Sequence, residues 1–248
     1  MSAKVLVIGA HNDDPECGVG GTTALLTKAG CDAMFFAVAP MWHKPDLTPE
    51  MKEEWARQEV RAANILGADY RVIGTRDGDL RDPNTELVKE LSAAIVDYAP
   101  NIVFIHWPKD FHIEHQMAAA MSYKALCLAH VNRCVFNEVY AFEASIHQTG
   151  RFFNPEILVN IGDVRKQLEE SILCFDQNTA RGAGVWNCHI KQAECLATEI
   201  GWQAAEAFRV VKFPNGSDDF LLRRLLGDRF RWAGNGMYPA GAEPYFGL

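Results

Sequence analysis

The run Val5-Leu6-Val7-Ile8-Gly9-Ala10 and the polar residues after it, His11-Asn12-Asp13-Asp14, decide how this chain is interpreted. The first run is apolar and contains β-branched side chains, which predicts a short strand buried on both faces. Residues 22–29 then have a helical composition that Gly30 closes. A buried strand, a polar turn and a helix together form the first half of a βαβ unit.

The same alternation continues through the first half of the chain. Apolar runs at residues 33–39, 70–73 and 101–106 predict further short strands, and residues 50–66 and 86–98 predict the helices between them. Short buried strands that alternate with helices predict a mostly parallel, Rossmann-like sheet flanked by helices. The fold class is therefore α/β.

The second half adds elements to this core. Residues 135–142 and 157–161 predict strands, and residues 164–175 and 187–204 predict helices. No repeat, low-complexity segment or Pro/Gly/Ser linker divides the chain. We interpret residues 1–248 as a single domain in which the added strands and helices close the pocket.

Composition excludes several classes of protein. The chain carries 24 Lys and Arg against 32 Asp and Glu, for a net charge of -8, so it lacks the basic surface of nucleic-acid-binding and membrane-surface proteins. Its seven cysteines are scattered, which favours free thiols in a reducing compartment. No apolar run approaches the roughly 20 residues that cross a bilayer. We expect a cytoplasmic protein with no nucleic-acid or membrane partner.

Two segments rich in histidine and carboxylate follow predicted strands. One is residues 11–14, and the other is Asp110-Phe111-His112-Ile113-Glu114-His115, which opens a helix predicted over about residues 115–130. In a parallel sheet, ligands bind beyond the carboxyl ends of the strands. The two segments supply a His/Asp/His set that suits Zn²⁺ with one position open for water. A spare carboxylate beside the ligands can take a proton from that water.

A structural interpretation of the same residues is available. Asp13 and Asp14 after a strand also suit a turn or the N-cap of the next helix, and His112 and His115 suit an exposed helix start. A non-catalytic nucleotide-binding module would use such turns, but it needs an acidic residue after the second strand, where Ala39-Pro40-Met41 has none. Two acid and histidine segments in one alternating chain favour the metal site.

Three further features are assigned to packing. Gly18, Gly20 and Gly21 do not have the spacing of a phosphate-binding loop, and acids precede them, so we expect them to allow close contact between helix and strand. His106 ends a predicted strand and is interpreted as a satisfied wall histidine rather than a fourth ligand. Cys17 is interpreted as a buried packing residue.

Both polar segments resemble motifs of the LmbE-like, or PIG-L-like, zinc-dependent N-deacetylases. Ala10-His11-Asn12-Asp13-Asp14-Pro15-Glu16, with Gly20-Gly21-Thr22 after it, is similar to the family's Ala-His-Pro-Asp-Asp motif. Residues 110–115 are similar to its Asp-x-His-Pro-Asp-His motif, and the resemblance covers about residues 4–210. Asn12 departs from the usual Pro, and Ile113-Glu114 departs from Pro-Asp.

The resemblance implies a role for each of the motif residues. It implies His11, Asp14 and His115 as zinc ligands. The chemistry of a His/Asp/His site also allows Fe²⁺ to replace Zn²⁺ in cells. It implies Asp13 as the general base that activates the water. His112 is then the imidazole that steadies the oxyanion or protonates the leaving amine.

Four more residues are assigned around this set. The resemblance implies that Asp110 and Glu114 orient the ligand histidines. Arg57 is a weak candidate for a substrate contact, and its alternative is a solvated helix charge. Trp42 follows the second strand, where it either stacks on a sugar ring or lies in an irregular surface loop.

The function that the resemblance implies is a zinc-dependent hydrolase. It would remove an acetyl group from an N-acetylated amino-sugar or its conjugate, using metal-activated water and an Asp general base. Two alternatives stay open: a metal-dependent amidase acting on a thiol-sugar conjugate or a non-sugar amide, and the non-catalytic nucleotide-binding module. Relatives of this kind often form homo-oligomers, so we expect one here.

Overall fold

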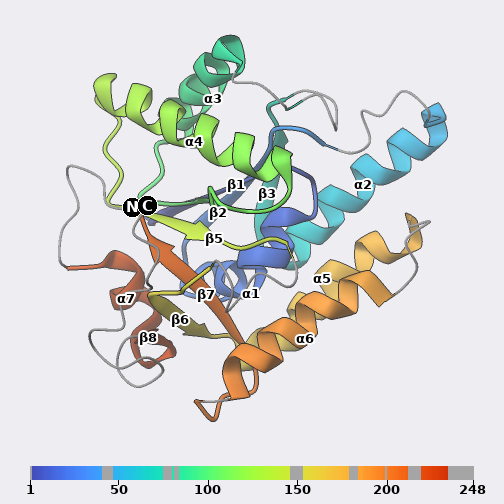
Figure 1. Cartoon of the computed structure of the whole chain (residues 1–248), viewed down its shortest axis with the longest axis vertical. Helices are drawn as coiled ribbons and strands as arrows, with labels where there is room; N and C mark the ends of the chain where they lie inside the picture. Colours follow the sequence, from blue (N-terminus) through green and yellow to red (C-terminus); the bar gives the residue numbers. More distant parts are fainter. Residues whose placement is uncertain are drawn as a thin grey trace.

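A computed structural model describes residues 2–40, 47–74, 80, 84–145, 153–178, 184–198, 200–211 and 219–233. Its centre is one sheet with the strand order β3-β2-β1-β4-β5-β7-β6-β8 (Figure 1). The parallel strands are β1 (Lys4–Gly9), β2 (Asp32–Ala37), β3 (Ala68–Val72), β4 (Ile102–His106) and β5 (Glu138–Phe142). The antiparallel extension is β6 (Ile157–Asn160), β7 (Ala205–Val210) and β8 (Phe230–Trp232). The α/β fold with a Rossmann-like parallel core is confirmed.

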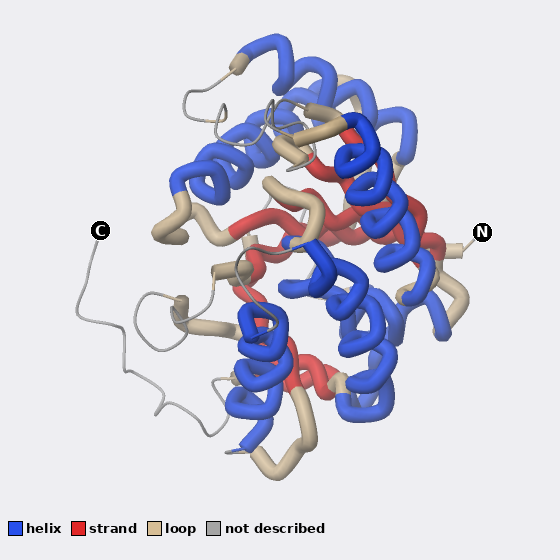
Figure 2. The backbone as a smooth tube through the Cα atoms, turned by 90° about the vertical axis from the view of Figure 1, so that its right-hand side faces the viewer, coloured by secondary structure: helices blue, strands red, loops and turns tan. Residues whose placement is uncertain are grey.

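Helices cover both faces of this sheet (Figure 2). One face carries α3 (Thr85–Tyr98) and α4 (Ile113–Val131). The other carries α1 (Asp14–Lys28), α2 (Pro49–Ile65), α5 (Arg165–Ile172) and α6 (Gly184–Thr198). The short α7 (Leu221–Leu226) precedes β8, and single 3-10 turns lie at Gly162–Val164, Leu173–Asn178 and Gly227–Arg229. Within the described part of the chain, no helix combines the length and apolar character that a bilayer crossing requires.

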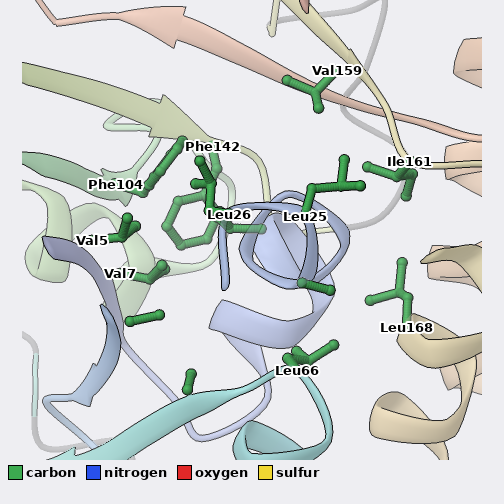
Figure 3. Close-up of a cluster of buried hydrophobic side chains, with 14 of the residues drawn as sticks. Val5, Val7, Leu25, Leu26, Leu66, Phe104, Phe142, Val159, Ile161 and Leu168 are labelled. Atoms are coloured by element: carbon green, nitrogen blue, oxygen red, sulfur yellow. The ribbon is translucent and has the colours of Figure 1, made fainter. Parts of the chain in front are cut away.

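The side chains of β1 alternate between two apolar cores. Val5 and Val7 point into the core beneath α1, whereas Leu6 and Ile8 point into the core beneath α3 and α4. All four side chains are fully buried, which explains why β1 is apolar without interruption. Figure 3 shows Val5 and Val7 beside Phe104, with Leu25 and Leu26 of α1 further along the same core.

Glycines bring α1 close to its neighbours. A Cβ at Gly18 would lie 2.2 Å from the ring of Phe142, and one at Gly21 would lie 2.7 Å from Ile161. The space between helix and sheet is therefore too small for any side chain, and the assignment of these glycines to packing is confirmed. The predicted helix start at residue 22 was wrong, because α1 runs through the glycines from Asp14. Its tight packing offsets their low helix propensity.

Two strands of the extension were not predicted. The helix expected over residues 187–204 ends at Thr198, and residues 205–210 form β7 instead. Ala-Glu-Ala-Phe-Arg-Val has a weak strand signal, because alanine and glutamate are depleted in strands. Its pairing with β5 and β6, rather than its local preference, makes it a strand. The cysteines, all of them described, are free thiols, as predicted.

Candidate metal centre

The two polar segments meet where the order of the sheet reverses. β1 and β4 are neighbours, the chain leaves β1 toward β2, and it leaves β4 toward β5 on the opposite side. Such a switch point opens a crevice beyond the carboxyl ends of the two strands. His11 follows β1 and His106 ends β4, so both histidines line this crevice.

The side chains of His11, Asp14 and His115 converge there and are buried. Nδ1 of His11 lies 3.2 Å from Nε2 of His115, which in turn lies 3.2 Å from Oδ1 of Asp14. Nδ1 of His11 is 3.5 Å from the other oxygen of that carboxylate. Zinc bonds of about 2.0–2.2 Å to nitrogen and oxygen require ligand atoms about 3.3–3.6 Å apart in a tetrahedron. The spacing and chemistry of these donors therefore fit a divalent metal ion.

The outer nitrogen of each of these histidines faces a carboxylate. Nε2 of His11 is 2.8 Å from Oε2 of Glu114, and Nδ1 of His115 is 3.2 Å from Oδ2 of Asp110. A proton on each outer nitrogen leaves the inner nitrogens with lone pairs that point at the proposed ion. Ser145 donates from its hydroxyl to Oδ1 of Asp110 at 2.6 Å, which fixes that carboxylate in turn.

Side chains of residues 110–114 point alternately into the site and into solvent. Asp110 and Glu114 are 1% and 2% exposed, whereas Phe111 and Ile113 between them are 71% and 51% exposed. The backbone of His112, at the centre, is extended. An extended backbone turns successive side chains to opposite sides, so the polar residues share the inward side.

The two oxygens of Asp14 have different surroundings. Oδ2 accepts a hydrogen bond from the backbone N–H of His11 at 2.7 Å and lies 3.0 Å from Nε2 of His106. Oδ1 faces His115. Burial would raise the pKa of Asp14, but His115 and His106 outweigh it and hold that pKa well below its usual range. The carboxylate is therefore ionised and held through one oxygen, with the other turned toward the site.

His106 packs against two of the proposed metal ligands, His115 and Asp14. Its ring is fully buried and stacks on His115 with ring centroids 4.4 Å apart. The backbone N–H of Ala10 donates to its Nε2 at 2.8 Å. The expectation of a satisfied wall histidine was wrong in one respect, because no residue in the described part of the chain forms a hydrogen bond with its buried Nδ1. Burial lowers the pKa of His106.

Asp13 occupies the N-cap position of α1 without capping it. Its side chain makes no capping hydrogen bond, so the capping role considered for this carboxylate is wrong. One of its oxygens lies within 4.8 Å of ligand atoms of His11 and Asp14. Burial, together with the adjacent charge of Asp14, raises the pKa of Asp13 to about 6. A carboxylate with such a pKa is a stronger base than an exposed one.

His112 does cap its helix, and the cap defines its tautomer. The backbone N–H of Glu114 donates to Nδ1 of His112 at 3.3 Å. Burial, with the charges of His115 and His11, lowers the pKa of His112. A neutral ring that accepts at Nδ1 carries its proton on Nε2. The ring lies edge-on to His11 and stacks on His115, with centroids 4.9 and 4.6 Å away.

Arg57, one of the two weaker candidates, does not join this cluster. The guanidinium of Arg57 is exposed on α2 and pairs with Glu53 and Glu54 at 2.7 and 3.0 Å. Its substrate contact stays a prediction, and this position gives it no support. Trp42 lies outside the described residues. Sequence reasoning also missed Ser145, whose hydroxyl contacts Asp110 and His115. It also missed His189, which lies within electrostatic reach of Asp14 and His115.

The part of the chain that contains most of this site is similar to a known protein family. The family model described as PIG-L, GlcNAc-PI de-N-acetylase, matches residues 6–126, which include both polar segments. The matched region runs from β1 into α4 and contains all the residues that converge at the metal centre except Ser145.

The relatives of this chain are distant. The diacetylchitobiose deacetylase of Thermococcus kodakarensis is 29% identical over 173 residues, which are 65% of this chain and 64% of that relative's length. The N,N'-diacetylchitobiose deacetylase from Pyrococcus horikoshii has a TM-score of 0.71 at 19% identity, over 85% of this chain and 84% of that one. The 4-carboxy-2-hydroxymuconate hydratase GalB from Pseudomonas putida KT2440 has a TM-score of 0.72 at 20% identity, over 88% and 99%. Structural likeness at such identities shows a shared fold.

Proposed function

We propose that this protein is a zinc-dependent deacetylase that removes the acetyl group from an N-acetylated amino-sugar or its conjugate. The observation that carries the proposal is the convergence of His11, Asp14 and His115 at 3.2–3.5 Å, with Asp13 beside them. The family match and the deacetylases among the relatives support the choice of reaction.

The metal would be held by His11, Asp14 and His115. When bound, zinc supplies a Lewis acid that polarises the acyl oxygen and lowers the pKa of water. The same nitrogen and oxygen donors also suit Fe²⁺. Asp110 and Glu114 keep the outer nitrogens of the two histidines protonated, so that their inner nitrogens stay available as ligands.

Two of the chain's own groups would then carry the proton transfers and charge stabilisation. Asp13 takes the proton from the attacking water, because its carboxylate is left free by the helix it precedes, and gives it to the amine nitrogen as the C–N bond breaks. His112 donates a hydrogen bond from Nε2 to the acyl oxygen as negative charge develops there. A donor fixed in advance by a helix cap needs no reorganisation during the reaction.

A second candidate keeps the metal and changes the bond that is cleaved. The hydratase among the structural neighbours shows that this fold supports more than one reaction. An amide in a thiol-sugar conjugate, or a non-sugar amide, would use the same ligands and the same base. The nucleotide-binding alternative has less support, because the crevice is lined by carboxylates that would repel phosphate.

Acetate release tests the proposal directly. The zinc-loaded protein is incubated with N-acetylglucosamine, N,N'-diacetylchitobiose and N-acetylglucosaminyl-phosphatidylinositol, with and without a strong chelator. We expect acetate from at least one substrate, its loss with chelator, and its return when zinc is added back. Release that persists after complete removal of metal would overturn the metal role. No release from any amino-sugar, by protein that holds zinc, would favour the different amide.

A further inference from the structure

The outer face of α4 is apolar along its whole length. The 19 residues of this helix include one acid, Glu114, which is buried at the metal centre, and one lysine, Lys124. Figure 1 shows α4 on the outside of the sheet, with α3 beside it. The outward faces of its neighbours are different, because each carries several exposed charges. These are Glu53, Arg57 and Arg61 on α2, and Glu86, Lys89 and Glu90 on α3.

Large apolar side chains that are exposed to solvent concentrate at this helix. Of the nine such side chains in the described part of the chain, five lie on α4 or within four residues of its ends. Val131, in its last turn, is 77% exposed. Single exposed apolar residues are normal, but a row of them on one element marks an interaction site. The five residues are Phe111, Ile113, Tyr123, Val131 and Val135.

The outward residues have the spacing of a contact between two helices. Successive members are alternately four and three residues apart, and none of them is buried. This is the pattern by which two helices interlock their side chains at a crossing angle of about +20°. Ala120 and Cys127 are small, so a second helix axis can approach to about 8–10 Å. We call the set the α4 seam: Ile113, Met117, Ala120, Lys124, Cys127 and Val131.

The α4 seam is complementary to a second copy of itself. In an antiparallel pair, with a two-fold axis between Ala120 and Lys124, each contact occurs twice. Long side chains then meet short ones across the axis. A parallel pair would instead place the two Lys124 ammonium groups against each other. The antiparallel contacts are Ile113 with the partner's Val131, Met117 with the partner's Cys127, and Lys124 with the partner's Ala120.

The charge of the protein favours a second copy over a membrane as the occupant of this face. The net charge is -8, so an anionic bilayer repels the chain, and one lysine is far from the cluster of basic residues that lipid headgroups attract. Two copies of an acidic protein also repel each other. This repulsion is weakest where acidic side chains are absent from the surface, as they are on the outward face of α4.

We propose that two copies of this chain associate through the α4 seam, antiparallel about a two-fold axis. The seam is about 28 Å long, shorter than a standard interface requires, so we expect a dissociation constant in the micromolar range. The contact would end at Phe111 and Ile113, which alternate with the carboxylates that orient the ligand histidines. It concerns assembly and holds whichever bond the metal centre cleaves.

Sedimentation velocity of the full chain, from about 1 to 100 µM, tests the association. We expect a dimer, or an assembly that contains it. Ala120→Lys places two lysines against two others, and should raise the dissociation constant at least about 100-fold, because opposed like charges are costly at an interface. Val60→Lys, at a 46% exposed position of α2 on the other side of the sheet, is the matched control. A monomer at every concentration, or equal association of Ala120→Lys and wild type, would overturn the proposal.

Cross-linking tests the register and separates lost association from lost folding. With diamide as oxidant, Met117→Cys should give a covalent dimer through the partner's Cys127, because the two positions face each other. Met117→Cys combined with Cys127→Ser should give none, and neither should Val60→Cys. A dimer that does not form this cross-link would overturn the antiparallel seam. A monomeric wild type that dimerises once residues 234–248 are removed, or that binds phosphatidylcholine vesicles, would show a different occupant and overturn it as well.

Discussion

Nδ1 of His11 and Nε2 of His115 face each other at 3.2 Å. Each ring turns its other nitrogen to a carboxylate, Glu114 for His11 and Asp110 for His115. If both outer nitrogens are protonated, the inner nitrogens point their lone pairs at each other. These lone pairs repel, so a positive charge between the two nitrogens is required. Burial would lower the pKa of His115, yet Asp14 and Asp110 raise it to about 9, so in the absence of metal a proton occupies that place. A divalent cation meets the same requirement with three donors.

The first prediction concerns the carboxylate behind His115. Asp110→Asn should weaken zinc affinity about 10- to 100-fold, because an amide orients the imidazole less strongly than a carboxylate. Competition against a chromophoric chelator at fixed pH measures the effect. Asp97→Asn is the control, since that side chain is 82% exposed and precedes the amino end of β4, whereas the site lies beyond the carboxyl end of that strand. Equal zinc affinity in Asp110→Asn and wild type would show that Asp110 has no orienting role.

The second prediction separates holding the metal from moving the proton. Asp13→Asn should retain zinc and lose about 10²- to 10⁴-fold in kcat, the usual contribution of a general base. His115→Ala should lose both zinc and activity, because it removes a ligand. Zinc content by mass spectrometry and acetate release are measured on the same samples. A near-normal rate in Asp13→Asn would refute its assignment as the base.

The sequence predicted the part of the fold that has a local signal. β1 and β4 are buried on both faces, so their apolar runs are continuous and easily recognised. β7 lacks such a run, since its position depends on pairing with β5 and β6. The start of α1 was missed because its glycines disfavour a helix until Phe142 and Ile161 pack against them.

In the candidate site, too, residues with a local sequence signal were predicted, and residues whose contacts depend on the fold were not. His11, Asp14 and His115 lie in short motifs, and the resemblance of those motifs to a family named them. His106 is 92 residues from Asp14 in the sequence, and the contact between them depends on β1 and β4 being neighbours in the sheet. His189 is on a helix of the second half, and nothing in its local sequence distinguishes it from a surface histidine.

The third prediction tests the close packing of α1. Gly18→Ala should destabilise the protein by about 1–3 kcal/mol, because the new methyl would lie 2.2 Å from the ring of Phe142. Gly20→Ala is the matched comparison in the same helix. Its methyl would meet the end of the Leu168 side chain at 2.6 Å, which can move, and alanine gains about 1 kcal/mol of helix propensity. Urea unfolding of both variants should therefore rank Gly18→Ala well below Gly20→Ala, and the reverse order would contradict the packing argument.

The fourth prediction concerns a carboxyl group buried between β7 and α1. Glu206 accepts hydrogen bonds from the backbone N–H groups of Gly21 and Thr22 at 2.7 and 2.8 Å. Burial outweighs these bonds and raises the pKa of Glu206 from 4.5 to about 7. The folded protein therefore holds this proton more tightly than the unfolded chain does. Stability from this group is present in full below pH 4.5 and is lost as the pH rises to about 7.

Glu206→Gln isolates that contribution, because the amide does not titrate. The free energy of unfolding is measured by urea denaturation from pH 4.5 to 8 for the variant, the wild type and Glu90→Gln, an exposed control. The decline with pH should be steeper in the wild type and the control by up to about 1.4 kcal/mol per pH unit, the limit for one proton. The amide can accept only one of the two hydrogen bonds, so lower stability at every pH is expected and decides nothing. Parallel pH profiles for Glu206→Gln and wild type would mean that the pKa of Glu206 is the same in the folded and the unfolded protein, contrary to the prediction.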